Sequence, residues 1–441
     1  MTFRPARVFE LLLSIGTLFA WAVAAPVMAQ VEEPSSAGGE WRQWGGPQRN
    51  FQVDGSQLAD RWPAEGPRRV WSRPLGLGHS AIIVDEGRLF TMYRPGQESP
   101  GGPWAGEERV VALDATTGDT LWEYSYPSEP LNFREGAGPH STPLVVGNLL
   151  FTAGTNKQIH AFDKATGDVV WSHDLVAEYD APPTLIRPAV KAGYASSPTA
   201  WQDMVIVTAG GDGQSVVAFR QQTGELVWKS GDFLISPSTP LLVDVDGETQ
   251  LIVFGGQTVN GLDPDTGRVI WSHEHDTSGD MNTATPLWGG DNVLVVSSSY
   301  DGGTRALRLS REGSATHVEE LWFSRRLRLM FSNGLLLGDH VFGSSGDFGP
   351  AILTALDVET GAEVWQSRGF GRSSLVYSDG KVILLDEDGR LVLARFLPEG
   401  LEVLSEAPVF ETTSWSVPSL VGSTLYVRDR EQVIALDVGV P

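Results

Sequence analysis

Short runs of apolar residues recur along most of the chain, and turns rich in glycine, aspartate and proline separate them. Within a run, apolar residues alternate with polar ones or continue unbroken, which is typical of half-buried and buried β-strands. Many runs open with Ser/Thr-x-Pro, as at residues 141–143 and 196–198, and a second run follows after a tight turn such as residues 379–380. The pattern therefore predicts repeating units of several short strands.

The end of each unit carries a fixed motif, Ala-x-Asp-x-x-x-Gly-x-x-x-Trp, in which an apolar strand leads through a turn into a strand that bears the Trp. Five copies keep this spacing, and they cover residues 112–122, 161–171, 218–228, 261–271 and 355–365. An Asp side chain can accept hydrogen bonds from backbone amides of such a turn, and Gly tolerates the positive φ there. The Trp can bury roughly 150–250 Å² between neighbouring units.

Three weaker copies complete the set. Residues 306–322 have a longer turn, residues 394–404 end in Leu in place of Trp, and residues 435–437 have neither turn nor Trp. The missing last strand stands at the other end of the chain, at residues 69–71. Successive Trp residues lie 43 to 57 residues apart, close to the ~40–50 residues of a propeller blade. The sequence thus predicts an all-β, eight-bladed β-propeller with four-stranded blades, whose last blade is closed by the N-terminal strand.

The composition excludes several classes of protein. The 441 residues include no Cys, so disulfides, thiol catalysis, iron–sulfur clusters, covalent haem and lipidation through Cys are excluded. The 55 acidic residues outnumber the 32 basic ones and give a net charge of −23, which argues against nucleic-acid binding and against attachment to an anionic membrane through overall charge. Fifty Gly and 27 Pro agree with a fold rich in turns.

The first thirty residues have the features of an export signal. Arg4 and Arg7 precede an apolar stretch at 11–25, and residues 27–29 supply small side chains at the expected cleavage positions. A stretch of fifteen apolar residues is shorter than the roughly 20 needed to span a bilayer. We therefore expect a bacterial periplasmic or secreted monomer without a transmembrane segment or lipid anchor, divided into a signal peptide at 1–29, a flexible leader at 30–40 and the propeller at 41–441.

The eleven-residue motif resembles the tryptophan-docking motif of the pyrroloquinoline quinone (PQQ)-like repeat. Eight-bladed quinoprotein alcohol dehydrogenases share this repeat with the BamB-type lipoprotein of the outer-membrane assembly machinery. The resemblance covers residues 41–437, and the opening at 41–47 with Trp62-Pro63 is also similar to the start of bacterial secreted proteins built from this repeat. It implies the fold strongly, but it does not decide function, because catalytic and non-catalytic members use the same Trp.

The residues just before the first strand of each unit are expected to line one mouth of the central channel. In ring order they are His79, His140, Ala195, Pro237, Thr283, Phe331, Arg372 and Trp415, and the preceding position adds Tyr194 and Asn282. This column indicates a pocket for a planar or anionic small molecule, with Arg372 as counter-ion and Trp415 as stacking surface. The alternative is ordinary packing of loop ends around a water-filled channel. The candidate cofactor- or ligand-binding residues are His79, His140, Tyr194, Asn282, Arg372 and Trp415, and we assign no catalytic or metal-ligating residue.

For the dehydrogenases, the resemblance implies a PQQ pocket with Ca²⁺ held by carboxylate and amide side chains, and an Asp as base. No matching Glu–Asn–Asp pattern can be placed in this sequence, and the adjacent-cysteine disulfide and haem motif of some members need Cys. We therefore predict a non-catalytic binding or scaffold platform for a protein partner or a small ligand. The alternative is a divergent dehydrogenase that uses PQQ with Ca²⁺ to oxidise an alcohol or a sugar. The missing lipid anchor puts a BamB-type role in outer-membrane assembly in doubt.

Other motifs in the sequence give weaker evidence for a functional site. Residues 244–248 and 386–389 contain acidic residues as calcium loops do, but they lack the full ligand spacing and are predicted to be hairpin turns. The His-Glu-His segment at 273–275 has too few ligands for zinc and is predicted to be an exposed strand end. Residues 210–213 are a glycine-rich turn without the helix that a phosphate loop requires. Residues 177–193 are predicted to form a surface loop.

Overall fold

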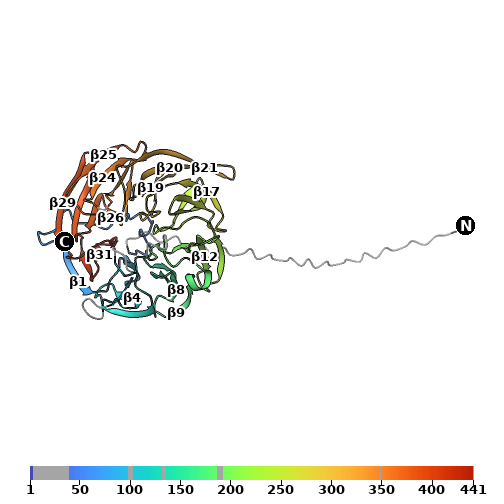
Figure 1. Ribbon diagram of the computed structural model, residues 1–441, viewed down its shortest axis with the longest axis horizontal. Coiled ribbons are helices and arrows are strands. Elements are labelled where there is room, and N and C mark those ends of the chain that lie inside the picture. The colour runs from blue at the N-terminus through green and yellow to red at the C-terminus, as the bar shows by residue number, and fades with distance from the viewer. Residues whose placement is uncertain (3–38, 98–102, 132–135, 186–191, 348, 441) are drawn as a thin grey trace. The chain divides into compact units, whose positions relative to one another are not determined.

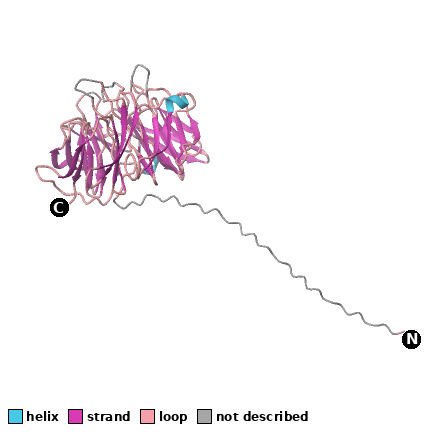
Figure 2. Ribbon diagram, turned by 90° about the horizontal axis from the view of Figure 1, so that it is seen from below, coloured by secondary structure: helices cyan, strands magenta, loops and turns pink. Residues whose placement is uncertain are grey.

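The computed structural model describes residues 1–2, 39–97, 103–131, 136–185, 192–347 and 349–440. Residues 3–29 of the predicted signal peptide and residues 30–38 of the predicted leader lie outside these residues. From Arg68 to Asp437, strands β1 to β32 form eight four-stranded antiparallel sheets. The sheets stand side by side around a central axis (Figures 1 and 2), so the predicted all-β, eight-bladed propeller is confirmed.

Blades 1 to 4 follow the chain in order. Blade 1 contains β2 (Ile83–Asp85), β3 (Arg88–Tyr93), β4 (Glu107–Asp114) and β5 (Thr120–Pro127). Blade 2 contains β6 (Leu144–Val146), β7 (Leu149–Ala153), β8 (Gln158–Asp163) and β9 (Val169–Asp174). Blade 3 contains β10 (Thr199–Trp201), β11 (Met204–Thr208), β12 (Val216–Arg220) and β13 (Leu226–Ser230). Blade 4 contains β14 (Leu241–Val245), β15 (Glu248–Phe254), β16 (Thr258–Leu262) and β17 (Val269–Glu274).

Blades 5 to 8 continue the ring. Blade 5 contains β18 (Leu287–Trp288), β19 (Val293–Ser298), β20 (Gly303–Glu312) and β21 (Ala315–Ser324). Blade 6 contains β22 (Leu335–Leu337), β23 (His340–Ser345), β24 (Ile352–Asp357) and β25 (Glu363–Ser367). Blade 7 contains β26 (Ser373–Ser378), β27 (Lys381–Asp386), β28 (Arg390–Leu397) and β29 (Gly400–Pro408). Blade 8 contains β30 (Ser419–Val421), β31 (Thr424–Arg428), β32 (Gln432–Asp437) and β1 (Arg68–Pro74).

Two short helices lie between strands in the part of the chain that the structure describes. They are α1 (Leu175–Tyr179), which follows blade 2, and the 3-10 turn η1 (Gly290–Asn292) inside blade 5. Among the residues that the structure describes, no helix is long and apolar enough to cross a bilayer. The prediction of a loop at residues 177–193 was wrong at its start, because residues 177–179 belong to α1. The side chain of Asp174 accepts hydrogen bonds from the amides of Val176 and Ala177 and so begins this helix.

The N-terminal strand closes the ring as the repeat predicted. Strand β1 pairs antiparallel with β32 and supplies the outermost strand of blade 8. Arg68 lies opposite Asp437, and the two side chains form an ion pair of 2.8 Å. The first and last strands of the ring are therefore hydrogen-bonded neighbours, which protects the edge of β32.

The repeated motif explains how neighbouring blades join. In the third and fourth strands of a blade, the small residue of the motif lies opposite the Trp, as Ala161 lies opposite Trp171. The Trp171 indole N–H then donates to the carbonyl oxygen of Gln221 in the turn of the next blade, at 2.8 Å. The same ring packs on Gly224 of that turn, where a Cβ would come within 2.8 Å of the indole. Five other Trp residues bond the next turn in this way: Trp71, Trp122, Trp228, Trp322 and Trp365.

Trp271 departs from this pattern for a visible reason. The blade that follows it replaces the short turn with the long hairpin of β20 and β21, so the usual acceptor is missing from its place. The indole N–H of Trp271 donates to Gln250 Oε1 of its own blade, at 2.8 Å. A Cβ on Gly261 would lie 2.1 Å from this nitrogen, which explains why the fourth copy of the motif has Gly where the others have Ala.

The segment before β1 lies across one end of the ring. Trp41 pairs with Val84 in blade 1, and the backbone amide of Val145 in blade 2 donates to Arg42. Further along, the Trp44 indole donates to Thr285 next to blade 5, at 2.7 Å.

The same segment continues to two more blades. The Gln52 side chain donates to Leu336 O in blade 6, and Val53 N donates to Tyr377 O in blade 7. Residues 41–53 bond the innermost strands of several blades, or in one case a residue two positions before such a strand. They therefore hold together the end where first strands turn into second strands.

Candidate functional site

The predicted column of residues lies at the opposite end, in the loops that enter the first strands. Most of its members precede their strand by four residues, as His79 precedes Ile83, whereas Arg372 stands directly before β26. Neighbouring loops are bonded to one another. His79 N donates to Pro139 O of the next loop, and the Ser416 hydroxyl donates to His79 O. The column residues of blades 8, 1 and 2 are therefore held at fixed positions around this mouth.

Four rings of the column form a continuous row. Phe331 and Trp415 have centroids 5.0 Å apart, Trp415 and His79 are 5.1 Å apart, and His79 and His140 are 5.0 Å apart with a 60° angle between their planes. The guanidinium of Arg430 lies over Trp415, 5.1 Å from its centroid. The row connects loops of blades 6, 8, 1 and 2, and the Trp415 ring keeps partial exposure to solvent. We call these five residues the aromatic row.

Charged side chains continue the site on blade 7. Arg372 forms an ion pair with Glu387, with Nη1 to Oε2 and Oε1 distances of 2.8 and 3.1 Å. The Trp415 indole N–H donates to the same carboxylate at 3.0 Å. Arg372 also donates to Asp347 O, and the Asp347 carboxylate binds Arg328 at 2.5 Å. The cation predicted to attract an anionic ligand is thus already neutralised by Glu387.

The environment of His140 sets its protonation. Burial lowers its pKa to about 4, and the positive charges of Arg430 and Arg428 act in the same direction. The imidazole is therefore neutral at pH 7, and it contributes an edge to the His79 ring without adding a charge. Arg428 itself is fully buried and donates to backbone oxygens of Gly76, Ser80 and Met92, which fixes the loops of blades 8 and 1 beneath the row.

Two candidate residues serve loop packing in this structure. The Tyr194 ring is buried, and its hydroxyl accepts a hydrogen bond from Thr208 at 3.2 Å. The Asn282 amide donates to Gly255 O at 2.6 Å and is also buried. Both side chains thus have structural partners within blades 3 to 5, where the column itself has only Ala195, Pro237 and Thr283. The role of Tyr194 and Asn282 as ligand-binding residues stays a prediction.

Sequence reasoning missed Glu387 and Arg430. Both lie in loops between the second and third strands, one residue after β27 and two residues after β31. These loops reach the same mouth as the predicted column, so a second column read at the end of each second strand would have found them. That column also contains Arg94 in blade 1.

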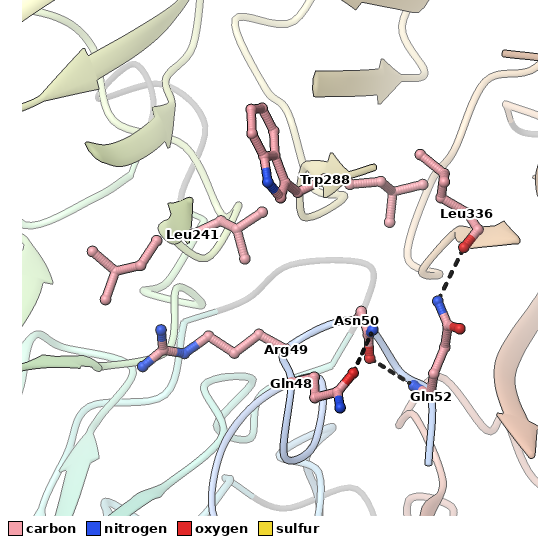
Figure 3. Close-up of a pocket in the computed structure, with 9 residues that line it drawn as sticks. Gln48, Arg49, Asn50, Gln52, Leu241, Trp288 and Leu336 are labelled. Carbon is pink, nitrogen blue, oxygen red and sulfur yellow. Dashed lines mark hydrogen bonds between the residues drawn. The ribbon is translucent and has the colours of Figure 1, made fainter. Parts of the chain in front are cut away.

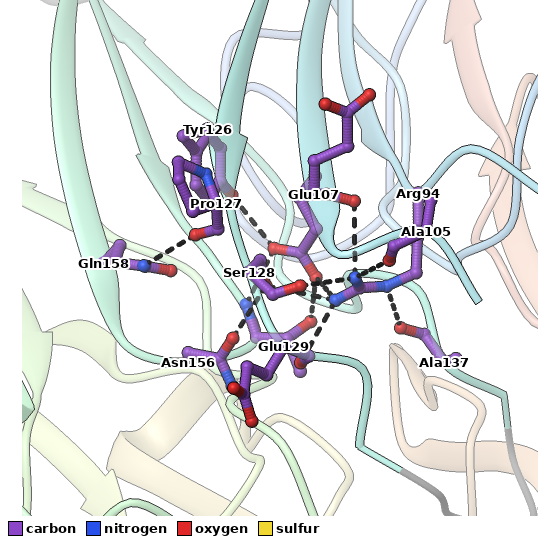
Figure 4. Close-up of polar contacts among 12 residues, drawn as sticks. Arg94, Ala105, Glu107, Tyr126, Pro127, Ser128, Glu129, Ala137, Asn156 and Gln158 are labelled. Atoms are coloured by element: carbon purple, nitrogen blue, oxygen red, sulfur yellow. Dashed lines mark hydrogen bonds and ion pairs between the residues drawn. The ribbon is translucent and has the colours of Figure 1, made fainter. Parts of the chain in front are cut away.

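Arg94 organises the neighbouring loops of blades 1 and 2 (Figure 4). Its guanidinium is fully buried and pairs with the buried carboxylate of Glu108 at 3.1 Å. It also donates to the backbone oxygens of Ala105, Ser128 and Ala137. The Glu108 carboxylate receives hydrogen bonds from Tyr126 and Thr155 as well. A buried ion pair is stable only when its remaining donors and acceptors are satisfied, and this network meets that condition.

The other motifs behave as turns, with one correction. Residues 244–248 and 386–389 connect adjacent strands of blades 4 and 7, and residues 210–213 connect β11 to β12. His275 was expected at an exposed strand end, but its side chain is buried, with Nε2 2.7 Å from Ser298 Oγ. Across the described ranges, no cluster of three or more His, Cys, Asp or Glu side chains is placed to hold a metal ion.

The mouth residues do not fit PQQ with Ca²⁺. PQQ carries three carboxylates, yet Arg372 is occupied by Glu387, whose carboxylate would repel an anion. The site thus offers stacking surface, but no spare cation from Arg372 and no group of acidic ligands among the described residues.

The comparisons with known proteins agree with the fold. A family model described as outer membrane protein assembly factor BamB matches residues 106–367. BamB of Escherichia coli (strain K12) is 28% identical over 326 residues, which are 64% of this chain and 78% of that protein. The crystal structure of BamB from Moraxella catarrhalis superposes with a TM-score of 0.57 at 17% identity, and covers 84% of this chain and 97% of its own. The crystal structure of quinohemoprotein alcohol dehydrogenase from Comamonas testosteroni superposes with a TM-score of 0.60 at 13% identity. The match covers 91% of this chain and 81% of that chain.

The fold and repeat define a PQQ-like β-propeller, a class that includes BamB and quinoprotein dehydrogenases. Within this class, the chain belongs to the family of outer membrane protein assembly factor BamB, since the family model matches more than half of it.

Proposed function

We propose that this propeller is a non-catalytic docking platform in the bacterial periplasm, and that the aromatic row receives a segment of a partner protein. The observation that carries the proposal is the row itself. The rings of Phe331, Trp415, His79 and His140 follow one another at centroid distances of 5.0 to 5.1 Å across four blades, and the Arg430 guanidinium lies over Trp415. Aromatic and Arg side chains are the residue types that dominate binding energy in protein interfaces.

Family membership supports the same function. The matching family model and the relative from Escherichia coli are named as outer membrane protein assembly factor BamB. A rigid ring with loops held by buried arginines suits partner docking. The mouth is also preorganised, because Glu387 fixes both Arg372 and Trp415 before any partner arrives. Preorganisation reduces the entropy lost on binding.

The test is site-specific photocrosslinking in the native host. A benzophenone amino acid replaces Phe331 in the row, and in a matched variant it replaces Leu121, which is exposed on the outer strand β5 of blade 1. We expect a discrete crosslinked partner from position 331 and none from position 121. Adding Arg430→Ala should weaken the crosslink several-fold, whereas Arg268→Ala, an exposed Arg in the turn of blade 4, should not. Equal crosslinking from both positions, or none from position 331, would contradict the proposal.

Calorimetric titration with PQQ, with and without Ca²⁺, tests the alternative. A non-catalytic platform predicts no binding in either condition. Micromolar or tighter binding that is lost in Trp415→Ala would favour a divergent quinoprotein dehydrogenase, and dye-reduction assays with alcohols and sugars would follow.

A further inference from the structure

A cavity of about 170 Å³ lies between the N-terminal segment and the first strands of blades 4 to 6 (Figure 3). One wall is apolar and consists of Leu241, Leu242, Leu287, Trp288 and Leu336. The other wall is polar and consists of Gln48, Arg49, Asn50 and Gln52. The cavity is at the end of the ring that residues 41–53 cover, opposite the aromatic row.

The polar wall contains one charged group. The Arg49 guanidinium donates to Gln43 Oε1 at 2.8 Å and to Ala200 O at 3.2 Å, and both acceptors are uncharged. These two bonds use two of its five N–H donors. Desolvation lowers the pKa of Arg49 to about 10, which still leaves it cationic at pH 7. A largely desolvated cation with uncharged partners is stabilised by an added anion.

The neighbouring amides are already engaged. The Asn50 side chain accepts from Gln52 N at 3.0 Å and donates to Gln48 Oε1 at 3.4 Å, and the Gln52 side chain donates to Leu336 O at 3.0 Å. These contacts fix the polar wall in place. Arg49 is therefore the group on this wall that is suited to bind an acidic ligand.

We infer that this cavity binds a small monocarboxylate with a compact apolar body. The carboxylate would accept hydrogen bonds from Arg49, a geometry that a planar guanidinium favours. The apolar body would lie between the leucine side chains and the Trp288 ring. An apolar cavity of about 150 Å³ holds benzene, so this volume suits a ligand about the size of benzoate. The inference does not depend on the proposed function at the aromatic row.

The test is a titration of the whole protein with benzoate, followed by calorimetry and by saturation-transfer NMR. Benzyl alcohol, which has a similar size without the charge, is the matched ligand. We expect saturable binding of benzoate and at least about tenfold weaker binding of benzyl alcohol, the effect of one charge-assisted contact. Arg49→Gln should weaken benzoate binding by about tenfold or more, and Arg49→Lys should retain part of it.

A second variant tests the apolar wall without removing the charge. Leu336→Phe fills the cavity and should abolish benzoate binding, whereas Leu121→Ala on the outer strand β5 of blade 1 should leave it unchanged. If Arg49→Gln unfolds the N-terminal segment, the benzyl alcohol comparison and Leu336→Phe still decide the question. Equal binding of both ligands, unchanged binding in Leu336→Phe, or no saturable binding of benzoate up to about 20 mM would overturn the inference.

Discussion

The pKa of His140 makes the stability of this protein sensitive to acid. Its pKa is lowered from 6.5 to about 4 by burial and by two nearby arginines. Between these values the unfolded chain binds a proton that the folded chain does not, so the free energy of unfolding decreases as the pH falls from about 6.5 to about 4. Burial also lowers the pKa of His160 to about 4 and that of His275 to about 3. These two histidines act in the same direction.

We therefore expect His140→Gln to reduce the acid-induced loss of stability. Urea denaturation at pH 7 and pH 4.5 should show a loss that is about 2.5 kcal/mol smaller than in the natural protein. His317→Gln is the control, because the His317 side chain is 58% exposed. An unchanged pH dependence in His140→Gln would show that this histidine titrates normally.

Lys157 has a dependence of the same sign at alkaline pH. Its Nζ is buried and donates to Ala209 O at 2.6 Å, and burial lowers its pKa from 10.5 to about 7. The unfolded chain binds the extra proton between pH 7 and 10.5, so stability should rise with pH through that window. Lys157→Met should add about 2 kcal/mol at pH 7, after the cost of the lost hydrogen bond, and should flatten the rise. Urea denaturation at pH 7 and 9.5 measures both effects; a natural protein without the rise would contradict the prediction.

At the scale of single elements, the contact between a Trp and the next turn joins two blades. Gly224 has φ of +71° and lies under the Trp171 ring, whereas Gly247 has φ of +86° and open space around its Cα. Gly224→Ala and Gly247→Ala therefore share the backbone strain, but the first also forces a methyl group against the indole. We expect Gly224→Ala to lower the free energy of unfolding by about 2 kcal/mol more than Gly247→Ala in chemical denaturation. Equal losses would mean that the turn relaxes away from the ring.

The same contact explains how much of the fold the sequence could predict. The motif predicts the blades because its eleven residues contain both the small residue that lies opposite the Trp and the turn Gly, which in all five full copies lies under the Trp of the preceding blade. The hydrogen bond of Trp271 within its own blade was not predicted, because it depends on the hairpin of the following blade. Within the motif, the sign of this difference is Gly261, which stands where the other full copies have Ala.

At the scale of the whole molecule, the repeat predicted which residues lie at the mouth of the channel, but not which of their side chains pair. The column placed His79, His140, Phe331 and Trp415 near one mouth because every blade enters its first strand there. The column did not predict a partner for Arg372. Glu387 follows β27, so it is separated from Arg372 in sequence by the two strands β26 and β27. Pairing between loops is decided by side-chain reach and charge, which the spacing of a repeat does not encode. The predicted counter-ion was therefore found already paired.

The N-terminal segment at residues 41–53 and strand β1 have separate roles in the ring, and truncation of the chain distinguishes these roles. A chain that begins at residue 54 lacks the segment across the inner strands, including the buried rings of Trp41 and Phe51. It retains β1 and should fold as a monomer with a melting temperature several degrees lower, because apolar burial is lost while the ring stays closed.

A chain that begins at residue 75 also lacks β1, so the edge of β32 is unpaired and should promote aggregation. Circular dichroism melts and size-exclusion chromatography compare the two chains. Aggregation of both would assign ring closure to the N-terminal segment as well as to β1, whereas a monomeric, stable chain from residue 75 would show that three strands suffice for blade 8.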